Sequence, residues 1–231
     1  MHTATLLVLA NSWKRGGRCV AGRRVSIAGT QLTLGEWVRP VAPPSGTCEG
    51  ELLDRHCETS PGRQVRVLDV VQVPLRQPAP KPGQPENHEI VADKPWRRLG
   101  SVGTGSIRSL AEAPSGLWDL DPNRTDRVAA SDIERMSPRN SLVVIQPRSF
   151  RVKLRPKDGR MQWRGCFSYG SHEYDLSLTD DTFREDMASQ TGSATEFVPA
   201  FKDRCLLCIS LGGAFGDYHY KLVAAVIREP K

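Results

Sequence analysis

Residues 150–180 read FRVKLRPKDGRMQWRGCFSYGSHEYDLSLTD, and this stretch predicts a meander of antiparallel strands. Apolar and polar residues alternate through its first six positions and again over residues 161–169, which is the period of a strand with one buried face. Between these two runs, Asp158-Gly159 is a strong signal for a β-hairpin turn. A third alternating run, residues 173–180, completes the meander.

Similar strand signals continue on both sides of the meander. They are residues 5–10, 18–22, 25–27, 36–41, 65–75, 141–145, 205–211 and 220–227. Together with the meander they make about ten short strands in two clusters, near residues 1–90 and 140–231. About five short strands is the number that an OB barrel uses, although an SH3-like barrel or a small sandwich shows the same periodicity. The periodicity therefore predicts an all-β chain with two clusters of strands, and each cluster could form an OB-like barrel, an SH3-like barrel or a small sandwich.

The segments between the two clusters differ in composition. Residues 77–87, QPAPKPGQPEN, contain four prolines, which exclude a helix interior and a central strand and favour an extended arm. Residues 94–139 mix turn signals with short helical pieces. The predicted organisation is an N-terminal β unit over 1–93, a linker over 94–139 and a C-terminal β unit over 140–231. In this prediction the Pro-rich arm and the partly helical linker join the two units.

The composition is that of a basic globular protein. The chain has 231 residues, of which 39% are hydrophobic and 25% charged, and its formal net charge is +6. This excess of positive charge is compatible with nucleic acid as a partner, although many ordinary basic proteins share it. No apolar run approaches the roughly 20 residues of a membrane helix, and the first residues lack the pattern of a signal peptide. We therefore expect a cytoplasmic protein with no membrane partner, whose six cysteines are reduced.

The stretch 11–19, NSWKRGGRC, directly follows the predicted buried strand at residues 5–10. Its two glycines let the backbone approach a ligand closely, and its cations favour an anionic one. A solvated basic turn accounts for the same residues, and the spacing is not that of a P-loop. The candidate phosphate- or base-binding residues in this loop are Trp13, Lys14, Arg15 and Arg18.

Phe167 and Tyr169 form a second candidate site. They lie two residues apart on one predicted strand, so they face the same side, and Arg164 is close by in the sequence. An aromatic pair on a sheet face, beside a cation, could stack on unpaired bases. The alternative is plain packing in the core, because aromatics make up only 6% of the chain.

Arg39 and Lys221 are further candidate contacts for nucleic acid. The following proline holds Arg39 in an extended conformation, from which it could reach a phosphate or pair with Glu36 or Asp69. Lys221 lies with His219 and Tyr220 at the mouth of the final predicted hairpin, where these side chains could contact a ligand.

The sequence offers two weaker candidates for metal binding. The carboxylates of Asp180, Asp181 and Asp186 could hold Mg²⁺, but an aspartate here is more often the N-cap of the short helix expected over 181–188. The sequence therefore assigns no ligand for Mg²⁺ to these aspartates.

Zinc is the other metal to weigh. Cys205 and Cys208 have zinc-ligand spacing, and Cys48, His56 and Cys57 could complete a site. Because Cys205 and Cys208 lie within a predicted strand, their side chains would face opposite ways, which favours buried free thiols.

Six blocks of the chain, taken in order, resemble a known family. They are NSWKRGGRCVAG, GEWVRPV, VLDVVQVPL with the Pro-rich segment, SLVVIQP, FSYGSHEYDLSLTD and LLCISLGGAFGDYHYKLVAAVI. Together they cover nearly the whole chain and resemble bacterial and archaeal dual OB-containing domain proteins. The resemblance implies an all-β fold of two OB-like small barrels, an N-terminal OB-like barrel over 1–93 and a C-terminal OB-like barrel over 140–231. It also implies a role related to nucleic acid, in genome defence or DNA processing. It implies no catalytic residues.

The function favoured by these observations is binding of single-stranded or structured DNA or RNA, with cations on phosphates and aromatics on bases. No catalytic motif of the common hydrolase or metalloprotease types is found, and no cofactor is predicted. Two alternatives remain open. One is a metal-assisted enzyme acting on nucleotides or nucleic acid, with Asp180 or His172 in its site. The other is a non-catalytic adaptor that docks a helicase or nuclease partner.

Overall fold

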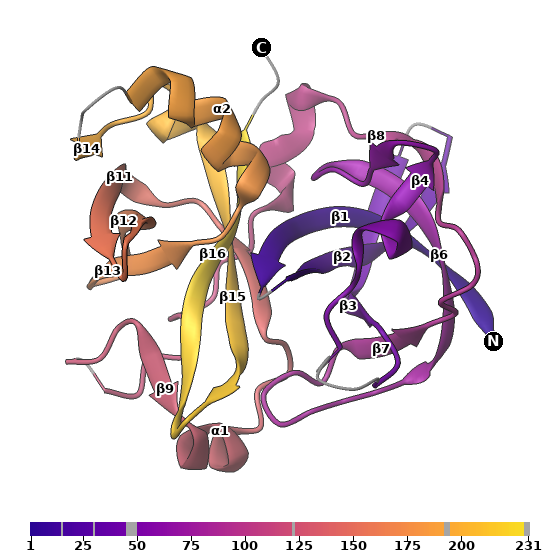
Figure 1. Cartoon of the computed structure of the whole chain (residues 1–231), viewed down its shortest axis with the longest axis horizontal. Coiled ribbons are helices and arrows are strands. Elements are labelled where there is room, and N and C mark those ends of the chain that lie inside the picture. The colour runs from indigo at the N-terminus through magenta and orange to yellow at the C-terminus, as the bar shows by residue number, and fades with distance from the viewer. Residues whose placement is uncertain (15, 30, 45–49, 122, 192–194, 229–231) are drawn as a thin grey trace. The chain divides into compact units, whose positions relative to one another are not determined.

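The computed structural model describes residues 1–14, 16–29, 31–44, 50–121, 123–191 and 195–228. Strands carry most of the regular structure (Figure 1). The chain divides into two compact units, Met1–Gly103 and Thr104–Lys231. None of the helices within the described ranges is long and apolar enough to cross a membrane.

Unit 1 is a closed barrel of five strands. The strands are β1 (His2–Lys14), β2 (Gly17–Ala28), β3 (Gln31–Val41), β6 (Asp69–Pro78) and β7 (Asn87–Ile90). The first three form an antiparallel meander, and β3 then runs parallel to β7. The antiparallel pairs β7–β6 and β6–β1 close the ring. A meander whose third strand lies parallel to the fifth is the topology of an OB barrel.

The Pro-rich segment belongs to this barrel and does not join the two units. It forms the turn between β6 and β7, where Ala79 N donates to Asn87 O at 2.8 Å and Lys81 and Gln84 pair through their backbones. The prediction of a connecting arm is wrong on this point. Prolines fit here because a turn leaves backbone positions that need no donor.

Short elements surround the barrel of unit 1. They are η1 (Asp54–His56), β4 (Glu58–Ser60), β5 (Arg63–Gln64) and β8 (Arg97–Ser101), which pairs with β6. Trp96 is buried in the core of unit 1 just before β8. The first residues of the expected linker are therefore part of unit 1.

Unit 2 repeats the same strand order. Its strands are β10 (Leu142–Ile145), β11 (Arg148–Lys157), β12 (Arg160–Tyr169), β13 (His172–Leu178), β15 (Cys205–Phe215) and β16 (Tyr218–Arg228). The meander β11–β12–β13 leads to a parallel pair, β13–β16, and β16 pairs with β15. β10 pairs with β15, and only two residues separate β10 from β11, which pairs with β12. β10 and β11 together therefore serve as the first strand of the OB order, with β15 as the neighbour of one half and β12 as the neighbour of the other. Unit 2 is therefore also OB-like.

Unit 2 also contains shorter strands and helices outside these six strands. They are η2 (Thr104–Leu110), β9 (Arg127–Ala129), α1 (Ala130–Met136), α2 (Asp181–Thr191), β14 (Glu196–Phe197) and η3 (Lys202–Arg204). β9 pairs with β16, and Leu117 is buried in the core of unit 2. Most of the expected linker is thus packed into unit 2. Contacts between residues that are distant in sequence determine this placement, so the local sequence pattern did not reveal it.

The cysteines that suggested zinc are buried in strand β15. Cys205 and Cys208 belong to the buried set of unit 2, and burial raises the pKa of Cys205 to about 12. Cys57 is buried in unit 1, and Cys48 lies outside the described residues. Within the described part of the chain, no group of three or more histidine, cysteine or acidic residues could hold a metal ion.

Asp180 caps helix α2 and is not exposed for a metal ion. Its Oδ1 accepts from Phe183 N at 3.0 Å, and its Oδ2 accepts from Val226 N at 2.9 Å. One carboxyl group therefore satisfies the first turn of the helix and a backbone donor of β16. Burial raises the pKa of Asp180 to about 6, although both backbone donors favour its ionised form.

We expect Asp180→Ala to lower the free energy of unfolding by about 2–3 kcal/mol, because it removes a cap and leaves two buried N–H groups without an acceptor. The matched control is Asp181→Ala, which removes an ion pair with Arg184 and an acidic charge in the first turn of α2 but leaves both backbone donors capped, and it should cost less than about 1 kcal/mol. Urea unfolding measures both. Equal losses in the two variants would contradict the capping role.

The same comparison has a pH dependence. The pKa of Asp180 in the folded protein lies above that of an aspartate in the unfolded chain, so the folded state binds a proton more tightly than the unfolded state does. This tighter proton binding stabilises the folded state at low pH, and the contribution is lost as the pH rises from about 4 to about 6. The difference between wild type and Asp180→Ala should therefore be larger at pH 4.5 than at pH 7. A difference that grows with pH would show that the pKa is lowered instead.

Candidate nucleic-acid interface

Strand β11 places its cations on one face. Phe150 and Val152 point into the core of unit 2, so the alternate residues point outward. β12 adds cations to that outer face, since Lys153 lies opposite Arg164 in the sheet. We call these residues the cationic face: Arg151, Lys153, Arg155, Lys157, Arg160 and Arg164.

Two carboxylates pair with part of the cationic face. Asp175 of β13 lies 2.6 Å from Arg155 Nη2 and 2.7 Å from Arg164 Nε. Burial alone raises the pKa of Asp175, but the hydrogen bond and charge of Arg164 outweigh it and hold the pKa below its ordinary value.

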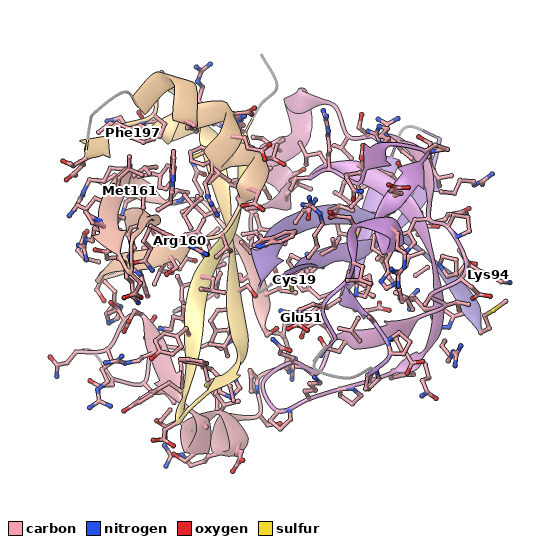
Figure 2. All side chains as sticks on the ribbon, in the orientation of Figure 1. Cys19, Glu51, Lys94, Arg160, Met161 and Phe197 are labelled. Atoms are coloured by element: carbon pink, nitrogen blue, oxygen red, sulfur yellow. The ribbon has the colours of Figure 1, made fainter. Side chains whose placement is uncertain are left out.

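Glu196 of β14 forms ion pairs with two other cations of the face. It lies 3.0 Å from Arg151 Nε and 4.0 Å from Lys153 Nζ. Lys157 and Arg160, at the end of the hairpin, are exposed and have no acidic partner among the residues that the structure describes. Figure 2 labels Arg160 beside strand β12 of unit 2. Because the cations outnumber the carboxylates, the face keeps an excess of positive charge.

An open cleft of about 350 Å³ lies on this face. The segment before β9 forms one wall, where Thr125 Oγ1 donates to Glu173 O at 3.1 Å. Its lining residues come from that segment and from β11, β12 and β13: Asn123, Thr125, Asp126, Arg151, Lys153, Arg164, Cys166, Glu173, Tyr174 and Asp175.

The hairpin β15–β16 ends in a cluster of aromatic side chains. Phe215 is 59% exposed, and its ring centroid lies 6.4 Å from that of Tyr220, which in turn lies 6.4 Å from that of Tyr218. Gly216 makes the turn between the two strands with φ +59°, which glycine permits. We call Phe215, Tyr218 and Tyr220 the aromatic tip. Phe215 is the exposed ring of the three, whereas Tyr218 and Tyr220 are partly buried, and an exposed ring can stack on a base that is not paired.

Two arginines connect the aromatic tip to the cleft. The guanidinium of Arg127 lies 4.9 Å from the Tyr218 ring centroid, and Arg124 Nη1 donates to the Tyr218 hydroxyl at 3.0 Å. These two arginines flank Thr125 and Asp126, which line the cleft. The cationic face, the cleft and the aromatic tip therefore adjoin one another within unit 2. Sequence reasoning considered Tyr220 at the mouth of this hairpin but missed Phe215 and Tyr218, although aromatics on both sides of the turn at Gly216 were a usable signal.

Phe167 and Tyr169 lie on the opposite face of β12 from Arg164. Phe167 is fully buried and stacks on Tyr174 with the ring centroids 5.1 Å apart. Tyr169 is partly buried, and its hydroxyl donates to Pro114 O at 2.8 Å. Since side chains alternate along a strand, an aromatic pair at 167 and 169 cannot share the face of residue 164. Both rings pack inside unit 2.

Arg39 is buried in the barrel of unit 1. Its side chain is 4% exposed, and its Nη2 lies 3.2 Å from Oε1 of Glu86, which is also buried. Its ion-pair partner is thus Glu86, whereas the two expected partners, Glu36 and Asp69, pair with other arginines. The turn that carries Glu86 lies far from Arg39 in sequence, which is why spacing did not reveal the pair.

Lys221 is also internal. Its Nζ lies 2.6 Å from Oδ1 of Asp119, and its side chain is fully buried. Burial lowers the pKa of Lys221, while the hydrogen bond to Asp119 acts in the opposite direction. The residue holds the interior of unit 2 together rather than facing a ligand at the surface.

The basic loop of unit 1 is described only in part. Trp13 is 39% exposed, and the guanidinium of Arg18 lies 5.7 Å from its ring centroid. Arg18 Nε also lies 2.6 Å from Oδ1 of Asp54, which neutralises part of its charge. Arg15 and the side chain of Lys14 lie outside the described residues.

The comparisons with known proteins agree with this architecture. The chain matches the family described as dual OB-containing domain over residues 4–226, which is nearly its whole length. Comparison with curated proteins and with solved structures found no match. Both units have the strand order that the family description requires. The chain therefore belongs to the dual OB-containing domain family.

Proposed function

We propose that the protein binds single-stranded nucleic acid through unit 2. Phosphates lie along the cationic face, and unpaired bases stack on the aromatic tip. The observation that carries this proposal is the continuity of the two surfaces through Arg124 and Arg127, which pack against Tyr218. OB barrels with this strand order are commonly used to bind oligonucleotides. A duplex hides the faces of its bases, so exposed rings favour a single strand.

We propose Trp13, Lys14, Arg15 and Arg18 of unit 1 as a second contact region. The exposed indole beside the Arg18 guanidinium supports it. From the family resemblance we also propose genome defence or DNA processing as the cellular setting.

The test is a fluorescence titration of a labelled dT oligonucleotide at several salt concentrations. We expect Lys157→Ala/Arg160→Ala to weaken binding and to reduce the slope of log affinity against log salt by about 1.4, since each phosphate contact to a single strand contributes about 0.7. Both side chains are exposed, so the fold is not at risk. Single-stranded probes should bind more tightly than a duplex of the same length.

The matched control is Lys94→Ala/Arg139→Ala, which removes the same two charges from exposed positions elsewhere. It should leave the slope nearly unchanged. A flat salt response of the wild type, or equal losses in the two double variants, would refute binding through the cationic face.

A further inference from the structure

We propose that the cleft of unit 2 takes one unpaired guanine of the bound strand, so that the protein prefers strands containing guanine. This inference rests on the proposed function and names the base that the same surface reads. The cleft volume of about 350 Å³ lies at the lower end of the range for small-ligand sites, roughly 300–1,000 Å³, which suits a single nucleotide.

The cleft has basic side chains on one side and acidic side chains on the other. Arg151 and Lys153, from β11, lie on one side of it. Glu173 of β13 and Asp126 of the segment before β9 lie on the other side, where Thr125 joins the two segments. A ligand that fits has an anionic group at one end and hydrogen-bond donors at the other. A nucleotide whose base carries N–H donors has this arrangement.

Two of the cleft carboxylates retain free acceptor capacity. Asp175 is occupied by two arginines, as described above. Glu173 accepts from the Ser168 hydroxyl and forms no ion pair with any residue in the described ranges. Asp126 Oδ1 is 3.8 Å from Arg127 Nε, at the limit of an ion pair. Each carboxylate offers about four lone-pair positions, so both can accept further donors.

Guanine is the base that matches a carboxylate best. Its N1–H and N2–H groups point the same way on the Watson–Crick edge and can donate to the two oxygens of one carboxylate. Cytosine and adenine each present a single amino group there. Thymine presents one N–H between two carbonyl oxygens, which a carboxylate repels.

The experiment compares three 11-mers: all-dT, dT with one central dG, and dT with one central deoxyinosine, which lacks the N2 amino group. We expect the dG strand to bind about tenfold more tightly than all-dT, with the inosine strand close to all-dT. Glu173→Gln/Asp126→Asn should abolish this preference, and the single variant that removes it identifies the carboxylate that holds the guanine edge, while all-dT binds at least as well as to the wild type. Glu134→Gln, at an exposed position of α1, is the control and should keep the preference.

The outcomes separate the two proposals. If all-dT does not bind at all, the proposed function itself fails. If all-dT binds with the expected salt dependence but dG adds nothing, only the guanine site is overturned. A dG preference that survives the double variant also overturns it, because another surface must then read the base.

Discussion

Lys221→Met is expected to lower the free energy of unfolding by about 3–5 kcal/mol, the usual cost of breaking a buried ion pair by removing one partner. The substitution keeps most of the side-chain volume but leaves the carboxylate of Asp119 buried without its counter-charge. Urea or thermal unfolding of the whole chain measures the loss.

The size of this effect follows from how Asp119 is held. The Tyr174 hydroxyl donates to its Oδ2 at 2.5 Å and Leu117 N donates to the same oxygen at 2.7 Å. Burial raises the pKa of Asp119, but the hydrogen bonds from Lys221 and Tyr174 outweigh it and lower the pKa overall. The ammonium also lies 5.6 Å from the Tyr174 ring centroid. Without Lys221, the carboxylate of Asp119 loses the one ion-pair partner that it has among the residues the structure describes.

Two further variants make the test decisive. Lys202→Met makes the same change at an exposed position and should shift stability by less than about 0.5 kcal/mol. Lys221→Met/Asp119→Asn should recover part of the loss, because a neutral amide costs less to bury than a carboxylate. If Lys221→Met instead leaves stability unchanged and weakens nucleic-acid binding, Lys221 is a surface contact after all.

Gly22→Ala is expected to cost about 3 kcal/mol or more. A Cβ at Gly22 would lie 2.2 Å from Leu7 O and 2.9 Å from Leu7 C, which are backbone atoms of β1. That strand is held between β2 and β6, with Leu7 itself opposite Val70, so it cannot move aside. The close approach sits beside the irregularity in the β1–β2 register between Val8 and Ala10. Overpacking against fixed backbone is strongly destabilising.

The matched control for Gly22 is Gly100→Ala on β8. No heavy atom lies within 4 Å of the Cβ built there, so we expect a change within about 0.5 kcal/mol. Chemical denaturation compares the two midpoints. Similar midpoints for both variants would mean that β1 tolerates displacement and that the barrel of unit 1 is less tightly closed than its pairing indicates.

The strands of unit 2 were predictable because their signals are local. Alternation over residues 150–180 predicts β11, β12 and β13, and the turn at Asp158-Gly159 has the positive φ values that such a hairpin needs, +50° and +72°. The cations of β11 were visible in the same alternation. The position of the aromatic tip next to these cations was not visible in the sequence. It depends on the contact between Arg124 and Tyr218, which are 94 residues apart in the chain.

The sequence by itself determined the strand content, the two clusters of about five strands and the family, because side-chain alternation and turn chemistry involve only neighbouring residues. Tertiary structure alone decided which charged residues reach solvent. Arg39 and Lys221 resemble surface cations in sequence, yet each meets a buried carboxylate from a distant segment, and Lys221 and Asp119 are 102 residues apart. It also placed the Pro-rich segment inside unit 1 and most of the expected linker inside unit 2. Burial and ion pairing depend on which segments pack together, and local pattern carries no information about that.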